Sequence, residues 1–312
     1  MTEPVPTPAP PTLCEPATVP ADIPRLLPLA DVLGLALADA EAAYEAKQSG
    51  QPLGPLSGIT WLDRELGGCF VPGLHVLHGE PGTGKTALAL QIAAAAACPA
   101  LFVTTEMGPA ELFRRHMARV TGTYLGRLRS GELSPEMFAQ LAREAAAAAP
   151  MLAFLDATRA YADAVLLREL GTVWRERHGG ATHLLVVVDS LHSWAAGAPV
   201  GLGADTEYER LNAALYALQR LALELAAAVL VVAERNRALM ASKSQSAGAG
   251  TRRIEYGAET VLAIQREGEG DWTPDAAGEY SVCLHVVKNR NGATGPKRDL
   301  RFHGALQTFH EV

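Results

Sequence analysis

The stretch that decides the fold of this chain is Gly79-Glu80-Pro81-Gly82-Thr83-Gly84-Lys85-Thr86. It fits the pattern G-x-x-x-x-G-K-[ST], in which a glycine-rich turn aims successive backbone N–H groups at a phosphate. We expect Lys85 to reach the terminal phosphates of a nucleotide, and the Thr86 hydroxyl to ligate Mg²⁺. The alternative is a glycine-rich turn that holds no ligand.

The residues on either side of this stretch favour the phosphate-binding interpretation. Residues 74–78 are apolar enough for a short buried strand, and residues 87–97 form an Ala/Leu-rich segment typical of a helix. A strand, a loop and a helix in that order are the context in which this motif binds nucleoside triphosphates. The helix N-terminus behind the loop adds partial positive charge.

Composition narrows the classes of protein that remain. The chain has 312 residues, 48% of them hydrophobic, and a formal net charge of −7, so it is not a general polycation. Its cysteines form no C-x-x-C pair, which argues against a zinc knuckle and a secreted disulfide framework. No basic residue precedes Arg25, and no apolar run approaches the ~18 residues of a membrane span. We therefore expect a cytoplasmic protein without a signal peptide and without a membrane partner.

Three regions follow from the order of residues along the chain. Residues 1–28 contain nine prolines and almost no apolar periodicity, which predicts a disordered tail. Leu29, Val32, Leu33, Ala36, Ala40 and Tyr44 follow helical spacing, and glycines and prolines at 50–55 then break the chain. We interpret 29–57 as a helix with a hinge, whose apolar stripe folds back or docks on a neighbouring subunit. Residues 58–312 form the main domain.

Strands and helices alternate through that main domain. Strands are expected at 100–105, 151–155, 183–188, 229–233, 260–265, 281–287 and 298–302, and helices at 109–120, 134–149, 162–178 and 206–226. Residues 183–188 form an unbroken apolar run, typical of a strand buried on both faces of a parallel sheet. The alternation predicts an α/β fold with a mostly parallel central sheet and right-handed crossovers.

Polar residues follow three of these expected strands. Ligands of open parallel sheets bind beyond the carboxyl ends of the strands, where the phosphate-binding loop, Glu106 and Asp189 all lie. If the strands are neighbours, Asp189 is suited to hold Mg²⁺ and Glu106 to orient or deprotonate the attacking water. We count Thr104 with residues 79–86 as a nucleotide contact. The alternatives are a turn cap for Asp189 and an exposed loop carboxylate for Glu106.

Further stretches carry a resemblance to a known family: Gly79–Thr86, Thr105-Glu106-Met107, Val188-Asp189-Ser190-Leu191, Val232-Ala233-Glu234-Arg235-Asn236-Arg237 and Lys288-Asn289-Arg290-Asn291-Gly292-Ala293-Thr294-Gly295. In this order they resemble the RecA-fold ATPase domain of DnaB-type replicative helicases, from roughly residue 30 to the end. RadA- and KaiC-like ATPases share that fold and are also similar around Asp189. The fold that the resemblance implies is a RecA-like P-loop NTPase core, preceded by a linker helix and the Pro-rich tail.

The resemblance also implies partners and residue roles. The family forms a ring, usually a homo-hexamer, which holds ATP and Mg²⁺ between subunits and acts on single-stranded DNA. Glu106 would match its catalytic glutamate and Asp189 its Mg²⁺-side aspartate. Lys288 and Arg290 would match basic fingers inserted toward the neighbour's γ-phosphate, where a cation supplied in trans stabilises the transferred phosphoryl. The alternative for these two cations is a solvated hairpin.

Two departures from the family pattern concern DNA. The family usually has glutamine where Glu234 stands, in a segment with Asn236 and Arg237 that links the nucleotide to the DNA loops. Its DNA-gripping loop usually reads Arg-Glu-Ser-Gly where this chain has Ala249-Gly250-Thr251-Arg252. Arg252 and Arg253 are then among the few cations near that loop.

Three hypotheses about function remain open. The first is a DnaB-like ring ATPase that translocates on single-stranded DNA in replication or repair. The second is a regulatory or assembly ATPase of the same fold that does not move on DNA. The third, a nucleotide-binding protein without hydrolysis, is disfavoured because Lys85, Thr86, Glu106 and Asp189 are all present.

Overall fold

The computed structural model describes residues 26–199, 206–234, 257–267 and 272–312. Its helices are α1 (Leu29–Ser49), α2 (Thr60–Glu65), α3 (Lys85–Ala95), α4 (Pro109–Thr121), α5 (Leu125–Ser130), α6 (Pro135–Ala148), α7 (Ala164–Arg177), α8 (Leu191–Ala196) and α9 (Glu207–Leu225). Its strands are β1 (Gly73–Gly79), β2 (Ala100–Thr104), β3 (Leu152–Asp156), β4 (Leu185–Asp189), β5 (Ala228–Glu234), β6 (Thr260–Arg266), β7 (Glu279–Asn289), β8 (Lys297–His303) and β9 (Thr308–Glu311).

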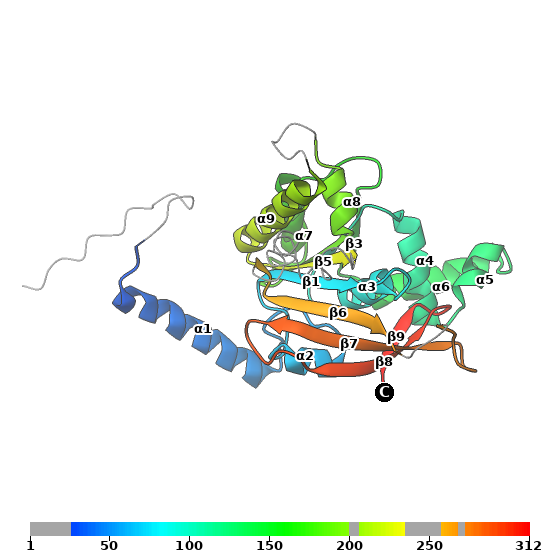
Figure 1. The fold of residues 1–312 in the computed structure, drawn as a ribbon, viewed down its shortest axis with the longest axis horizontal. Coiled ribbons are helices and arrows are strands. Elements are labelled where there is room, and N and C mark those ends of the chain that lie inside the picture. The colour runs from blue at the N-terminus through cyan, green and yellow to red at the C-terminus, as the bar shows by residue number, and fades with distance from the viewer. Residues whose placement is uncertain (1–25, 200–205, 235–256, 268–271) are drawn as a thin grey trace, which may run out of the picture. The chain divides into compact units, whose positions relative to one another are not determined.

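Within these described residues the strands form one nine-stranded sheet in the order β3-β2-β4-β5-β1-β6-β7-β8-β9 (Figure 1). The pairs from β3 to β6 are all parallel, and those from β6 to β9 are all antiparallel. The α/β fold with a mostly parallel central sheet, expected from the alternation of elements, is therefore confirmed. The parallel half places the carboxyl ends of its strands along one edge of the sheet.

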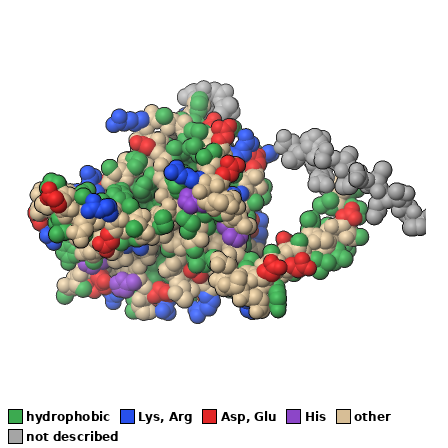
Figure 2. All heavy atoms as spheres, turned by 180° about the vertical axis from the view of Figure 1, so that it is seen from behind, with side chains coloured by type: hydrophobic (Ala, Val, Ile, Leu, Met, Phe, Trp, Pro, Cys, Tyr) green, Lys and Arg blue, Asp and Glu red, His purple; other side chains and the backbone are tan. Residues whose placement is uncertain are grey.

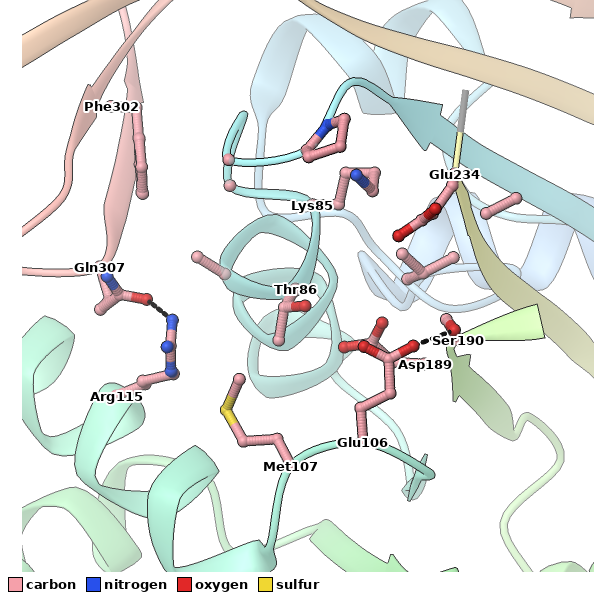
Figure 3. A pocket seen from close by; sticks show the side chains of 16 residues that line it. Lys85, Thr86, Glu106, Met107, Arg115, Asp189, Ser190, Glu234, Phe302 and Gln307 are labelled. Atoms are coloured by element: carbon pink, nitrogen blue, oxygen red, sulfur yellow. Dashed lines mark hydrogen bonds between the residues drawn. The ribbon is translucent and has the colours of Figure 1, made fainter. Parts of the chain in front are cut away.

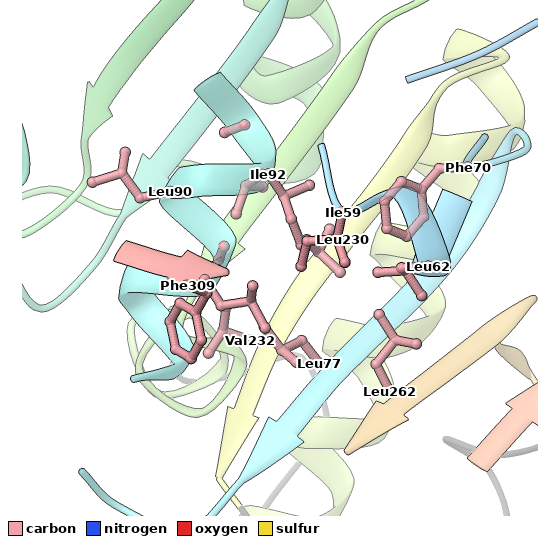
Figure 4. Close-up of a cluster of buried hydrophobic side chains, with 14 of the residues drawn as sticks. Ile59, Leu62, Phe70, Leu77, Leu90, Ile92, Leu230, Val232, Leu262 and Phe309 are labelled. Carbon is pink, nitrogen blue, oxygen red and sulfur yellow. The ribbon is translucent and has the colours of Figure 1, made fainter. Parts of the chain in front are cut away.

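Apolar side chains fill both faces of the parallel half. Along β4, Leu185 and Val187 belong to one buried cluster, whereas Val186 and Val188 belong to the other. The first cluster joins the sheet to α2, α3 and the C-terminal strands (Figure 4). The second joins it to α7, α8 and α9, which Figure 1 shows grouped together. The prediction of a strand buried on both faces is correct, because successive side chains of a strand point to opposite faces.

Helix boundaries follow local capping chemistry. The Thr206 side chain accepts the backbone N–H of Glu209, and the Glu209 side chain accepts that of Thr206, which is a complete capping box at the start of α9. At the starts of α6 and α7, the side chains of Ser134 and Asp163 each accept one backbone N–H. Four elements were not predicted, namely α2, α5, α8 and β9. Each spans six residues or fewer, too short for periodicity to reveal.

The first of the two compact units, Met1–Gly50, contributes one described helix, α1. This helix ends at Ser49. Gly50 follows it with a φ of +68°, and the Gly50 N–H donates to the Ala46 carbonyl, which closes the last turn. None of its residues is buried, and Leu29, Leu33, Leu37 and Tyr44 are exposed. A helix is therefore present where helical spacing predicted one, from Leu29 onward. The predicted docking of its apolar stripe on a neighbouring subunit stays a prediction.

Two further expectations concern the N-terminal tail and membrane-spanning helices. Most of the predicted disordered tail, residues 1–25, lies outside the described part of the chain. In the part that is described, no helix combines the length and the apolar character needed to cross a bilayer. The second compact unit, Gln51–Val312, contains the whole sheet.

Candidate functional site

The carboxyl ends of four neighbouring parallel strands bring the candidate residues together. The register pairs Thr104 of β2 with Asp189 of β4, Asp189 with Val232 of β5, and Glu234 of β5 with Gly79 of β1. The phosphate-binding loop leaves β1 immediately after Gly79. The adjacency of strands on which the sequence interpretation depended is therefore present.

The phosphate-binding loop curls as its glycines allow. Gly82 and Gly84 have φ values of +80° and +88°, a conformation that glycine adopts without strain. The Lys85 ammonium donates to the carbonyls of Gly79 and Glu80, at 3.0 and 2.9 Å, so it lies over the loop. Burial lowers the pKa of Lys85, and the nearby carboxylates of Glu234, Asp189 and Glu106 oppose this shift. A bound phosphate would take the place of those carboxylates as counter-charge.

Thr86 and Asp189 form an oxygen pair that suits a hard divalent cation. Asp189 is 8% exposed at the end of β4, and its carboxylate receives a hydrogen bond from Thr86. Burial raises the pKa of Asp189 to about 6, and the negative charge of Glu106 adds to this effect. Mg²⁺ prefers one or two protein oxygens with water and phosphate as its other ligands. The pair therefore fits Mg²⁺, whose positive charge would favour the ionised form of Asp189.

Glu106 lies on the bend just beyond β2. Its Oε1 accepts hydrogen bonds from the hydroxyls of Ser190 and Ser193, at 2.5 and 2.6 Å. Burial alone would raise the pKa of Glu106, but these two hydrogen bonds, together with the charges of His192 and Lys85, lower the pKa below its usual value. The carboxylate is therefore ionised at neutral pH, as a base that orients or deprotonates water must be.

A cavity of about 360 Å³ opens between these groups (Figure 3). Its lining includes most of the sequence-predicted contacts: Pro81, Gly82, Gly84, Lys85, Thr86, Glu106, Asp189 and Glu234. Gly79, Glu80 and Thr83 build the loop from behind, where the Thr83 hydroxyl donates to the Glu80 carbonyl at 2.9 Å. Thr104 does not line the cavity. It is buried, and its hydroxyl donates to the Met107 carbonyl, which supports the bend that carries Glu106.

Three lining residues belong to no motif in the sequence: Arg115, Phe302 and Gln307. A fourth, Met107, lies in the stretch Thr105-Glu106-Met107 but had no role assigned to it. Arg115 comes from α4, and its guanidinium donates to Gln307 Oε1 at 2.5 Å and to Glu111 Oε1 at 3.3 Å. Phe302 comes from β8, and Gln307 directly precedes β9. Arg115 therefore joins Lys85 as a second cation on the cavity wall. Only the helical spacing of α4, combined with knowledge of the sheet order, could have indicated it.

We expect the change Arg115→Ala to weaken ATP binding by about tenfold, because a charge-assisted contact to phosphate and the anchor of Gln307 are lost together. Lysine should not restore the affinity, since it lacks the planar fork that reaches two acceptors. Arg114→Ala is the matched control, because Arg114 pairs with the same Glu111 but does not line the cavity. Calorimetric titration with a non-hydrolysable ATP analogue measures the difference. Equal affinities for the two alanine variants would contradict the assignment.

Gly84 provides a separate test of the loop geometry. A Cβ there would lie 2.7 Å from Phe309 Cζ and 3.1 Å from the Phe302 ring, at a φ of +88°. Gly84→Ala should lower the free energy of unfolding by about 2–4 kcal/mol, combining backbone strain with overpacking. Gly131→Ala is the control, because its φ of +79° is similar but nothing lies within 4 Å. Urea denaturation compares the two, and equal losses would show that the ring contacts are unimportant.

Lys288 and Arg290 lie at the opposite edge of the sheet from the loop of their own chain. Asn289 pairs with Thr260 at the start of β6, whereas Gly79 pairs with Ile264 four residues later, a separation of about 13 Å along the strand. The Lys288 ammonium donates to the Ala258 carbonyl at 2.6 Å, and Arg290 forms an ion pair with Glu259 at 2.7 Å. These cations therefore do not complete the cavity from within the same chain.

The remaining candidates, Asn236, Arg237, Arg252 and Arg253, lie outside the described residues. Their roles toward DNA stay predictions. Glu234, the last described residue before them, stands at the end of β5 on the cavity wall near Lys85 (Figure 3). Its position connects the nucleotide cavity to that segment.

Comparison with solved structures places the fold. A solved ATPase domain superposes with a TM-score of 0.72 at 18% identity, over 91% of this chain and 99% of that chain. A solved DnaB-like replicative helicase, described with its interactions with primase, gives a TM-score of 0.69 at 18% identity, over 91% of this chain and 70% of that chain. At such identities the likeness concerns the fold alone, which is the RecA-like one that the sequence predicted.

Comparison with related sequences and family models identifies the family of the chain. The replicative DNA helicase DnaB of Leifsonia xyli subsp. xyli is 24% identical over 296 residues, which cover 92% of this chain and 62% of that protein. The protein of the same name from Treponema pallidum is 27% identical over 264 residues, covering 82% and 56%. The chain thus spans less than two thirds of the length of these relatives. The model of the DnaB-like helicase C terminal domain matches residues 54–311, and the chain therefore belongs to that family.

Proposed function

We propose that this chain is a ring-forming, Mg²⁺-dependent ATPase of the cytoplasm that translocates on single-stranded DNA as part of DNA replication. The observation that carries the proposal is the meeting of Lys85, Thr86, Glu106 and Asp189 at one cavity. These residues supply a phosphate-binding loop, a cation site and an ionised base, the parts that phosphoryl transfer to water requires. Membership of the DnaB-like helicase C-terminal domain family adds the expectation of DNA as the track.

The shortage of positive charge in the cavity supports an oligomer. The described lining residues supply two cations, Lys85 and Arg115, and three carboxylates, Glu106, Asp189 and Glu234. Charge on a transferred phosphoryl needs further positive charge on the side away from the loop. We infer that Lys288 and Arg290, which lie at the opposite ends of the strands from the loop of their own chain, supply it to a neighbour in a head-to-tail ring. We propose a homo-hexamer, in which α1 packs on the adjacent subunit.

The residues that we expect to contact single-stranded DNA lie mostly outside the described part of the chain. The net charge is −7, and on the face in Figure 2 acidic and basic side chains are interspersed among the described residues. DNA contacts then depend on a local basic strip, for which Arg237, Arg252 and Arg253 remain the candidates, with Asn236 as an uncharged hydrogen-bonding candidate. Backbone N–H groups of a glycine-rich loop also hold phosphates.

A second candidate function is a regulatory or assembly ATPase that does not respond to DNA. Glu234 favours it, because a carboxylate on the wall of a phosphate cavity replaces the uncharged amide of the resembling family. Such a protein would form oligomers with ATP and hydrolyse it at a rate independent of DNA.

One experiment separates the two functions. ATP turnover of the full chain is measured with and without single-stranded DNA, while light scattering reports the mass of the assembly. The proposed function predicts stimulation by DNA, which weakens steeply as salt rises. Turnover by an assembled ring without any DNA response would favour the regulatory ATPase. Full turnover by a monomer would contradict both.

A further inference from the structure

Two serines hold one oxygen of the Glu106 carboxylate. Ser190 Oγ lies 2.5 Å and Ser193 Oγ 2.6 Å from Glu106 Oε1 (Figure 3 draws the first contact). Ser190 follows β4 directly, and Ser193 lies in the first turn of α8. The two hydroxyls therefore come from the segment that follows Asp189 in the sequence, whereas Glu106 comes from the bend after β2.

The available protons assign the direction of these bonds. Each serine hydroxyl has one proton to donate. Ser190 Oγ accepts the backbone N–H of Ser193 at 3.4 Å and lies 3.2 Å from Ser193 Oγ, but its shortest contact, at 2.5 Å, is with the Glu106 carboxylate, so its proton goes to Glu106. An ionised carboxylate can only accept, so Ser193 donates to Glu106 as well. Both donors converge on Oε1, and neither serine occupies Oε2.

The same region fixes the backbone on which Glu106 stands. The Thr105 hydroxyl donates to the Asp189 carbonyl at 2.9 Å and accepts the Ser190 N–H at 2.9 Å. The Thr104 hydroxyl holds the Met107 carbonyl at 2.5 Å. Backbone and side chain of Glu106 are thus tied to the end of β4. Without the serines, an exposed glutamate beside the like charge of Asp189 would be free to rotate away.

We propose that Ser190 and Ser193 are positioning residues for ATP hydrolysis, which hold Glu106 by Oε1 so that Oε2 faces the attacking water. The inference rests on the proposed ATPase function. It gives a role to Ser193, which no motif contains, and to Ser190, which the stretch Val188-Asp189-Ser190-Leu191 contains without a role. The rate acceleration by a general base depends strongly on its position, because a small displacement lengthens its hydrogen bond to the attacking water.

The test is a double-mutant cycle on ATP turnover of the full chain with saturating Mg²⁺. Ser193→Ala should lower kcat about tenfold and leave KM within about twofold, because Ser193 is not part of the cavity lining. Ser193→Thr keeps the hydroxyl and should restore kcat. In the Glu106→Gln background, Ser193→Ala should change kcat by less than about twofold, since the group it positions no longer acts.

Ser130→Ala is the matched control, because its hydroxyl also donates to a glutamate, Glu132, at 2.9 Å but outside the cavity. Ser190→Ala is a secondary variant, since it also removes the cap of α8. A parental kcat in Ser193→Ala, a raised kcat, or an equal loss in both backgrounds would each overturn the inference while the ATPase function stands. If Glu106→Gln is as fast as the parent, Glu106 is not the base and the inference falls with it. If the parent hydrolyses no ATP, the proposed function itself fails.

Discussion

Replacing Arg290 with alanine is expected to lower ATP turnover by about 10³-fold or more, while the affinity for nucleotide stays within about twofold of the parent. Arg290 lies beyond the start of β6, at the edge of the sheet opposite the phosphate-binding loop of its own chain. Its effect on hydrolysis must therefore arise at the loop of a second copy. Binding survives because Lys85 and Thr86 belong to the chain that holds the nucleotide.

The variant should fold normally. Arg290 is 51% exposed at its side chain and pairs with Glu259, and exposed ion pairs contribute only about 0–1 kcal/mol to stability. Arg298→Ala is the matched control, because Arg298 is also a partly exposed arginine of the C-terminal strands, bonded to the Val312 carbonyl at 2.8 Å. Steady-state turnover and analogue binding are measured for both. Normal hydrolysis by the Arg290 variant would contradict the assignment of a finger supplied in trans.

The sequence could predict the parts of the site that follow single strands. Residues 79–86, Glu106 and Asp189 lie at, or begin within two residues of, the carboxyl ends of the apolar runs that become β1, β2 and β4. Parallel strands place their carboxyl ends at a common edge, so only the order of the strands was missing. The pairing of Thr104 with Asp189, and of Gly79 with Glu234, supplies that order.

The rest of the site depends on packing that no local pattern records. Arg115 reaches the cavity because α4 returns beside the sheet, and Gln307 because the last two strands extend the sheet past the loop. Their hydrogen bond joins positions 192 residues apart. Ser193 likewise could not be predicted, because its contact with Glu106 depends on its position in α8. That helix has six residues, too few for periodicity to reveal.

The change Glu106→Gln is expected to lower kcat by about 10²–10⁴-fold. Glutamine keeps the size of the side chain, and its amide oxygen can still accept from Ser190 and Ser193, so the geometry of the bend is retained. It loses the negative charge that orients and deprotonates water. Removal of that charge from a wall shared with Asp189 and Glu234 should leave ATP affinity unchanged or slightly improved.

Mixing the Arg290→Ala and Glu106→Gln chains in one assembly tests the Glu106 prediction most sharply, because each chain keeps the residue that the other lacks. The Arg290→Ala chain keeps its own Glu106, and the Glu106→Gln chain keeps its Arg290. Where an Arg290→Ala cavity meets a Glu106→Gln neighbour, the cavity is complete and turnover should return. Glu132→Gln is the control for the glutamine change, since Glu132 contacts Ser130 and Arg127 outside the cavity. If the mixture stays as inactive as its components, Glu106 and Arg290 do not act on the same nucleotide from two chains.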